Sequence, residues 1–219
     1  DHNVLLNQYL HTKFSFPLDH YFTLLGPCHA EEVAAEKLSY LTVAANQLEI
    51  AEKVKQYLVG PYITVKCSND LLGAEYAAVM KNIYAIGAGI AHGLGYGDNF
   101  LALYTSCAIR EMEAFLNVLD PSDERDVNEA AYLGDLLVTG YSVFSRNRMF
   151  GNMIGKGYTV KSAQMEMSMV AEGYYACKSA YNLNLEYKAK TPIIDAVYQI
   201  LYEGKNAKAV FSKLTEKLD

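Results

Sequence analysis

The sequence changes character at Asn69, and this change limits the folds open to the chain. Before Asn69, short strand-like runs alternate with helical segments, whereas after it only helical periodicity remains. Strands separated by helices favour a mostly parallel sheet. About half of the 219 residues are apolar, enough for a sizeable core in one or two domains. We expect an α/β part of about 70 residues joined to an all-helical part of about 150.

The α/β part divides into short elements with clear boundaries. Glu31 and Glu32 lie in the first turn of a predicted helix, where the helix dipole favours acidic side chains. The turn before that helix is Gly26-Pro27-Cys28-His29-Ala30. The other predicted elements are a helix at Val4–Leu10, a strand at Tyr21–Leu25, a strand at Leu41–Ala45, a helix at Leu48–Leu58 and a strand at Tyr62–Lys66.

The helical part contains at least four predicted helices. Asp98–Leu119 repeats its apolar residues every 3.6 positions, and Asp120-Pro121-Ser122-Asp123 resembles an N-cap followed by proline at the first helical position. The remaining two helices span residues 71–86 and the segment from Thr191-Pro192 to Gly204.

The glycine-rich stretch 87–97, GAGIAHGLGYG, resembles a loop that cradles a dinucleotide. Such a loop needs a strand before it and a helix opening after it. Here a helical pattern precedes the glycines, and Asp98 begins a helix of its own. We therefore favour close helix packing at Gly87 and Gly89, followed by a turn.

Two groups of residues carry chemistry that the helical part does not need for folding. Lys81 stands on an apolar helix face without an acidic partner one turn away, so it could transfer protons, although a lysine that reaches past that face to solvent is more common. Ser145-Arg146-Asn147-Arg148 combines two guanidinium groups with an amide and a hydroxyl, which suits phosphate binding; a solvated basic turn is the equal alternative.

Charge and cysteine content exclude several classes of function. The net charge of −6 is spread along the chain and leaves no basic stripe for nucleic acid. The sequence predicts no membrane span and no metal site, because its longest apolar run is broken by glycines and no cysteine or histidine has ligand spacing. We expect a soluble cytoplasmic protein with four separate thiols: Cys28, Cys67, Cys107 and Cys177.

Six motifs in register closely resemble the NAD(P)-dependent glycerol-3-phosphate dehydrogenase family. The resemblance extends from about residue 20 to 205, and it implies a Rossmann-like sheet domain, here only its C-terminal part (1–69), followed by an all-helical substrate domain (70–219). The motifs are Gly26-Pro27-Cys28-His29-Ala30, Lys81-Asn82, Gly134-Asp135-Leu136 with Thr139, Ser145-Arg146-Asn147-Arg148, Val170-Ala171-Glu172-Gly173 and Ala196–Lys205.

The resemblance implies interconversion of dihydroxyacetone phosphate and sn-glycerol 3-phosphate, which supplies glycerolipid synthesis. Lys81 would exchange a proton with the C2 oxygen of the substrate while hydride moves to or from NAD(P)H. Substrate would also contact Gly26, Cys28, Asn82, Asp135, Thr139, Ser145, Arg146 and Asn147. The cofactor would contact Ala30, Arg146, Val170 and Glu172, while Met165 and Met169 are expected in the core.

Two departures from the family pattern qualify this expectation. Cys28 stands where members commonly carry serine or threonine, which weakens a hydrogen bond to substrate; no Cys–His arrangement supports a nucleophilic thiol. The family's dinucleotide fingerprint is missing upstream, and the chain begins at Asp1. We therefore expect a C-terminal fragment that binds the cofactor poorly and is inactive alone.

Two other functions stay open. A non-catalytic helical module could keep the phosphate-ligand pocket for regulation or assembly, although Lys81 with Asp135 has little use there. A hydroxy-acid dehydrogenase of the 6-phosphogluconate type has a similar layout, but the Ser145–Arg148 segment favours a three-carbon phosphate. The apolar helices also leave room for a homodimer.

Overall fold

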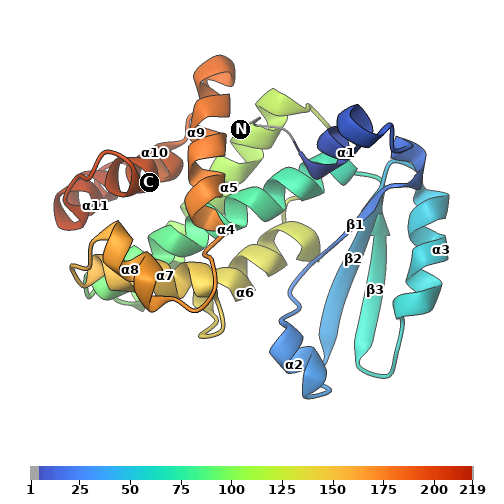
Figure 1. Cartoon of the computed structure of the whole chain (residues 1–219), viewed down its shortest axis with the longest axis horizontal. Coiled ribbons are helices and arrows are strands. Elements are labelled where there is room, and N and C mark those ends of the chain that lie inside the picture. The colour runs from blue at the N-terminus through green and yellow to red at the C-terminus, as the bar shows by residue number, and fades with distance from the viewer. Residues whose placement is uncertain (1–4, 219) are drawn as a thin grey trace. The chain divides into compact units, whose positions relative to one another are not determined.

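The computed structural model describes residues 5–218, which form two compact units (Figure 1). The first unit contains the chain up to Ala78 together with Ser122–Asp135, and the second contains Val79–Pro121 and the chain from Leu136 onward. Helix α4 (Leu71–Gly93) runs from the first unit into the second. A small sheet followed by a mostly helical region matches the predicted fold class, while the domain boundary at residue 69 stays a prediction.

The sheet of the first unit has three strands in the order β1-β2-β3. Strands β2 (Ser39–Ala45) and β3 (Ile63–Ser68) are parallel and are joined by α3 (Leu48–Leu58), whereas β1 (Phe22–Leu25) is antiparallel to β2. The predicted parallel arrangement is therefore wrong for β1. The helix after β1, α2 (Ala30–Ala34), buries no residue and cannot pack on the sheet as a crossover helix.

Alternate residues of β2 build a core on each face of this sheet. Val43 and Ala45 pack with Val65 and with Ala51 of α3. Ala44, which points to the opposite face, packs with Leu25 and with the first turns of α4. Because helices cover both faces, the second half of β2, residues 42–45, contains only small and β-branched residues.

Two predicted helices of the first unit differ from the structure. The N-terminal helix α1 spans Leu6–Phe14 and is followed by a 3-10 turn at Leu18–His20, so the predicted Val4–Leu10 helix is shifted; Val4 lies outside the described residues. The helix predicted from Asp120 is wrong, because Asp120 ends α5 and residues 121–129 form turns. Polar groups of these turns bind elsewhere instead: Asp126 accepts from the Asn128 backbone N–H at 2.9 Å, and Arg125 binds Asp70.

The second unit is helical, and α5 (Asp98–Leu119) passes through its core. The apolar stripe predicted for α5 is confirmed, with Tyr104, Met112 and Phe115 at most 1% exposed. No helix among residues 5–218 has the length and apolarity needed to cross a membrane. The other helices are α6 (Asp135–Tyr141), α7 (Arg146–Gly155), α8 (Val160–Glu166), α9 (Gly173–Tyr187), α10 (Pro192–Leu201) and α11 (Ala207–Thr215).

Glycines let α4 and α7 touch backbone to backbone. A Cβ on Gly89 would overlap the Arg148 carbonyl, and a Cβ on Gly151 would overlap the Ile86 carbonyl. Gly155 meets α4 in the same way one turn later. The predicted helix-packing role of the glycine-rich stretch is therefore confirmed, and only Gly95, with φ +85°, forms the turn after α4.

Candidate substrate-binding residues

The predicted site residues divide between the two units, and each group has its own geometry. Four of them, Gly26, Cys28, Ala30 and Asp135, belong to the first unit. The second unit holds Lys81, Asn82, Thr139, Ser145, Arg146, Asn147, Val170 and Glu172.

Asp135 and Gly26 meet in the first unit. The Gly26 backbone N–H donates to Oδ2 of Asp135 at 3.2 Å, and Asp135 is only 2% exposed. Gly26 has φ +121°, and a Cβ there would lie 2.6 Å from the Tyr40 carbonyl oxygen, so both its conformation and its packing require glycine. Gly134 packs on the Pro27 ring, with 3.4 Å from an added Cβ to Cγ. We call this group, Gly26, Gly134 and Asp135, the Asp135 network.

Cys28 lies beside the Asp135 network as a free, partly buried thiol. Burial raises the pKa of this thiol, and the nearby Asp135 carboxylate acts in the same direction although Ser39 opposes it. A thiol with a raised pKa is a poor nucleophile at neutral pH. Ala30 is exposed at the start of α2.

In the second unit, Asn147 binds to both Asn82 and Gly173. Its Nδ2 donates to Oδ1 of Asn82 at 2.9 Å, and its Oδ1 accepts from the Gly173 backbone N–H at 2.9 Å. A Cβ on Gly173 would lie 2.5 Å from the Asn82 carbonyl oxygen, so the start of α9 approaches α4 closely. We call this group, Asn82, Asn147 and Gly173, the Asn147 network. It depends on the glycine contacts that hold α7 against α4.

The segment Ser145–Arg148 opens α7 rather than forming a turn. Ser145 caps the helix, its Oγ accepting from the Arg148 backbone N–H at 3.3 Å. Ser145 is buried, whereas Arg146 is exposed at the first helical position. Amides and a guanidinium at a helix start favour an anion there, which fits the predicted phosphate contact.

Lys81 and Thr139 lie on helices of the same unit. Lys81 is half-buried on α4, directly before Asn82 of the Asn147 network. Thr139 is 7% exposed on α6. The role predicted for each stays a prediction.

Val170 borders a pocket of about 370 Å³ in the second unit. Val170 is 52% exposed, and Glu172 is exposed at the start of α9. The predicted core positions of Met165 and Met169 are wrong, because these side chains are 78% and 60% exposed. Met165 lies on the exposed side of α8, whose buried residue is Ala163, and Met169 follows the end of α8 at Glu166, so it leaves the helical register. The pocket is lined by Phe150, Gln164, Met167, Ser168, Met169, Val170, Ala171, Tyr174 and Tyr175.

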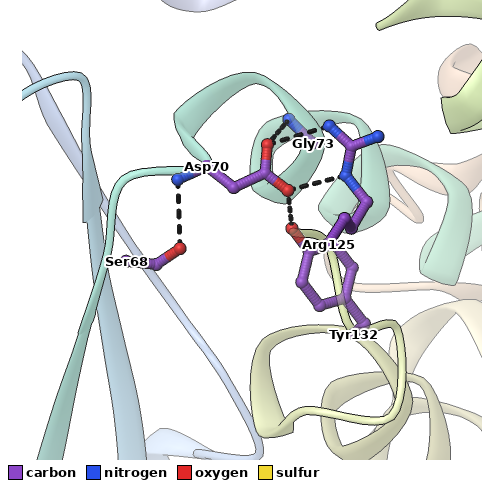
Figure 2. Close-up of polar contacts among 5 residues, drawn as sticks. All are labelled: Ser68, Asp70, Gly73, Arg125 and Tyr132. Atoms are coloured by element: carbon purple, nitrogen blue, oxygen red, sulfur yellow. Dashed lines mark hydrogen bonds and ion pairs between the residues drawn. The ribbon is translucent and has the colours of Figure 1, made fainter. Parts of the chain in front are cut away.

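Sequence reasoning missed a cluster in the first unit formed by Asp70, Arg125 and Tyr132 (Figure 2). Arg125 lies in a run of charged residues that is typical of a solvated loop, yet its side chain is 1% exposed. No spacing in the sequence links it to Asp70, 55 residues earlier.

Comparisons with known proteins identify the family of this chain. The profile of the NAD-dependent glycerol-3-phosphate dehydrogenase C-terminus matches residues 70–212. The curated glycerol-3-phosphate dehydrogenases (NAD(P)+) of Ligilactobacillus salivarius and Exiguobacterium sp. are 38% and 39% identical over 194 residues. Each match covers 89% of this chain and 57% of the relative, so the chain spans little more than half their length.

Solved structures show the same similarity. The crystal structure of glycerol-3-phosphate dehydrogenase from Coxiella burnetii superposes with a TM-score of 0.90 at 28% identity, covering 98% of this chain and 65% of that one. Because the profile match covers more than half of the residues, the chain belongs to the NAD-dependent glycerol-3-phosphate dehydrogenase family.

Proposed function

We propose that this chain supplies the substrate-binding part of an enzyme that interconverts dihydroxyacetone phosphate and sn-glycerol 3-phosphate with NAD(P)H. Family membership supports the reaction class. The observation that carries the proposal is the Asn147 network, because it joins Asn82, next to Lys81, to the capped start of α7 through hydrogen bonds of 2.9 Å. A proton-transfer group and an anion site within one rigid framework suit a phosphorylated ketone.

The phosphate would bind at the start of α7. Ser145 and Asn147 are held by hydrogen bonds, so they lose little freedom on binding, and Arg146 extends from the same helix turn to pair with phosphate oxygens. Thr139 on α6 would contribute a further hydroxyl. In the first unit, Gly26, Cys28 and Asp135 would form the remaining substrate contacts.

Lys81 would handle the proton. When bound, the nicotinamide supplies or accepts hydride at C2. During reduction the Lys81 ammonium would give a proton to the C2 oxygen, and during oxidation its neutral amine would take that proton back. Lys81 is half-buried on α4, beside Asn82 of the Asn147 network.

In the second unit, Arg146, Val170 and Glu172 would contact the cofactor. Val170 and Glu172 are exposed beside a pocket with aromatic and methionine lining, and Arg146 carries the charge suited to a phosphate group. The glycines of residues 87–93 are occupied by helix packing and do not serve a pyrophosphate. Ala30, at the start of α2, would be the cofactor contact of the first unit.

The wider role follows from the product. Glycerol 3-phosphate is the backbone of glycerolipids, so we place the enzyme at the entry to phospholipid synthesis. The four cysteines are free, which suits a reducing cytoplasm. Exposed apolar side chains such as Val118 and Leu185 would be compatible with a homodimer.

The test is loss of reduced-nicotinamide absorbance when dihydroxyacetone phosphate is added to the complete encoded polypeptide, with NADH and NADPH in parallel. Replacing Lys81→Ala should lower kcat at least about 100-fold, because general acid catalysis contributes that much. Lys161→Ala, an exposed lysine of α8, serves as the matched control and should leave kcat unchanged.

A folded wild-type protein that consumes neither cofactor would overturn the dehydrogenase assignment and favour a non-catalytic phosphate-binding module. Turnover of 6-phosphogluconate in place of dihydroxyacetone phosphate would move the enzyme to the related hydroxy-acid class. A Lys81→Ala variant with full activity would show that Lys81 does not transfer the proton, but it would leave the dehydrogenase assignment in place.

A further inference from the structure

The loop between α5 and α6 contains an ion pair that the proposed chemistry does not use. Arg125 Nε donates to Oδ2 of Asp70 at 2.6 Å, and its Nη2 donates to Oδ1 at 2.9 Å. The arginine side chain is 1% exposed and the aspartate side chain 18% exposed. A two-point contact of this kind fixes direction as well as distance. It anchors the loop to the start of α4.

Asp70 is itself held in place on both sides. Its Oδ1 accepts from the Gly73 backbone N–H at 3.1 Å, as an N-cap of α4, and its own N–H donates to Ser68 Oγ at 3.1 Å. Figure 2 shows the carboxylate between the Gly73 amide, the Arg125 guanidinium and the Tyr132 hydroxyl. The carboxylate is therefore held in one orientation, and the loop binds to it through Arg125.

Tyr132 connects a second point of the loop to the Asp70 carboxylate. Its hydroxyl donates to Oδ2 of Asp70, and the residue is 4% exposed. Tyr132 lies within a π-helical turn, Ala130–Gly134, which ends when the Asp135 backbone N–H donates to the Ala130 carbonyl. Tyr132 lies three residues before Asp135, which caps this turn, so movement of the tyrosine also shifts Asp135.

Asp135 depends on this turn for its contact with Gly26. The distance from Gly26 N to Asp135 Oδ2 is 3.2 Å, near the upper limit of a good hydrogen bond, so a small shift of the turn would break it. Beside it, a Cβ added to Gly134 would lie 3.4 Å from Cγ of Pro27, so the turn runs close to the Pro27 ring. The turn thus links Asp70 on one side to the Gly26–Cys28 segment on the other.

The ionisation states of Asp70 and Tyr132 keep the hydrogen bonds between Asp70, Arg125 and Tyr132 in place at neutral pH. Burial opposes ionisation of Asp70, but the hydrogen bonds from Arg125 and Tyr132 outweigh it and lower the pKa of this carboxyl. Burial and the bond to Asp70 raise the pKa of the Tyr132 hydroxyl, so it remains a donor at neutral pH.

We propose that Tyr132 and Arg125 are positioning residues for the substrate: bound to Asp70, they fix the π-helical turn so that Asp135 holds Gly26 and orients the Gly26–Cys28 segment. This rests on the proposed function, in which Asp135, Gly26 and Cys28 contact substrate. Neither Tyr132 nor Arg125 touches substrate in this account.

The test compares Tyr132→Phe with wild type in the complete encoded polypeptide. Removal of one hydroxyl leaves packing intact and should raise KM for dihydroxyacetone phosphate roughly tenfold, with a smaller fall in kcat and no change in KM for the nicotinamide cofactor. The matched control is Tyr21→Phe, whose hydroxyl also donates to a carboxylate of this unit, Oε1 of Glu75 at 2.7 Å, but at the far end of β1 from Gly26. It should change none of these constants.

A double-mutant cycle separates positioning from general loss of stability. If Tyr132 acts through Asp135, the Tyr132→Phe effect on KM should nearly vanish in an Asp135→Asn background. Arg125→Lys, which keeps the charge but loses the two-point contact, should raise KM by less than Arg125→Met. Equal effects of Tyr132→Phe in both backgrounds, or equal effects of Tyr21→Phe and Tyr132→Phe, would overturn the proposal.

Amide hydrogen exchange gives a readout that needs no activity. Tyr132→Phe should speed exchange at the Gly26 N–H by several-fold, because its acceptor is less well placed, while exchange within α3 stays as in wild type. If wild type reduces no dihydroxyacetone phosphate but Gly26 exchange responds, the proposed function fails, while the structural link from Tyr132 through Asp135 to Gly26 stands. An active wild type with unchanged KM and unchanged Gly26 exchange in the variant would refute the positioning role.

Discussion

The Asp135 network and the Asn147 network hold their residues by different means. Asp135 directly follows a π-helical turn, and its hydrogen bond with Gly26 depends on polar side chains in a loop. Asn147 sits on α7, which packs backbone to backbone against α4 through Gly89, Gly151 and Gly155. The position of Asp135 therefore changes when a single hydrogen bond is lost. The position of Asn147 changes only when α4 and α7 separate.

This difference shows which substitutions each network tolerates. Loss of one hydroxyl near Asp135 should alter substrate affinity without unfolding the chain. In contrast, one added methyl group between α4 and α7 should affect the stability of the whole second unit. Substitutions in the loop before Asp135 should therefore change substrate affinity with the smallest loss of stability.

The largest expected effect comes from Gly151→Ala. The added Cβ would overlap the Ile86 carbonyl, so α4 and α7 must move apart, at a cost of about 3 kcal/mol or more in the free energy of unfolding. Gly140→Ala on α6, where nothing lies within 4 Å of an added Cβ, is the matched control and should stabilise by about 0.5–1 kcal/mol. Urea unfolding measures both. Equal stability of the two variants would show that the glycine contact is not what fixes α7.

A smaller effect is expected from Asn147→Asp. The carboxylate can still accept from Gly173 but cannot donate to Asn82, and its charge opposes a bound phosphate, so KM for dihydroxyacetone phosphate should rise at least about tenfold. Asn117→Asp, at an exposed position of α5, should leave KM unchanged. Steady-state kinetics decide the matter: an unaltered KM in Asn147→Asp would place the phosphate elsewhere.

A pH-dependent effect is expected at Glu111, whose carboxyl group holds two backbone amides. Glu111 is 5% exposed, and its oxygens accept from the Ile193 and Ile194 N–H groups at 2.7 and 3.0 Å. Burial raises the pKa of Glu111 to about 8 even though these two bonds act the other way, and Asp195 adds to the rise. The ordinary value is 4.5.

Because the folded chain keeps this proton while the unfolded chain loses it, the free energy of unfolding should fall as pH rises from 4.5 to about 8. Glu111→Gln removes the titration and should flatten that slope, whereas Glu113→Gln, exposed on the same helix, should keep it. Urea unfolding at several pH values distinguishes them. An unchanged slope in Glu111→Gln would mean that the carboxyl is already ionised in the folded chain.

The sequence predicts the regular elements well because their signals are local. Examples are the apolar period of α5, the proline at the start of α10 and the β-branched residues of β3. Each of these signals comes from residues that are close together in the sequence. The direction of β1 could not be predicted, since it depends on whether α2 packs on the sheet. The helix expected from Asp120 is absent because residues 121–129 form turns, in which Arg125 binds Asp70.

The candidate residues came from motif resemblance, and the structure adds how they are held. No local pattern connects Tyr132 to Asp70, 62 residues apart, or Asn147 to Asn82, 65 residues apart. Glycine spacing on α4 did indicate a close helix partner, but it did not identify α7. Such long-range contacts depend on tertiary packing, so sequence periodicity does not encode them.

The central claim is that the start of α7 and the Asn147 network bind the phosphorylated substrate. Amide hydrogen exchange of the complete encoded polypeptide, with and without sn-glycerol 3-phosphate and with glycerol as control, tests it most directly. The account predicts that sn-glycerol 3-phosphate slows exchange at residues 145–148 and at Gly173. Glycerol should leave the exchange rates at these residues unchanged. Protection by both compounds, or no protection at these residues while the protein turns over substrate, would contradict it.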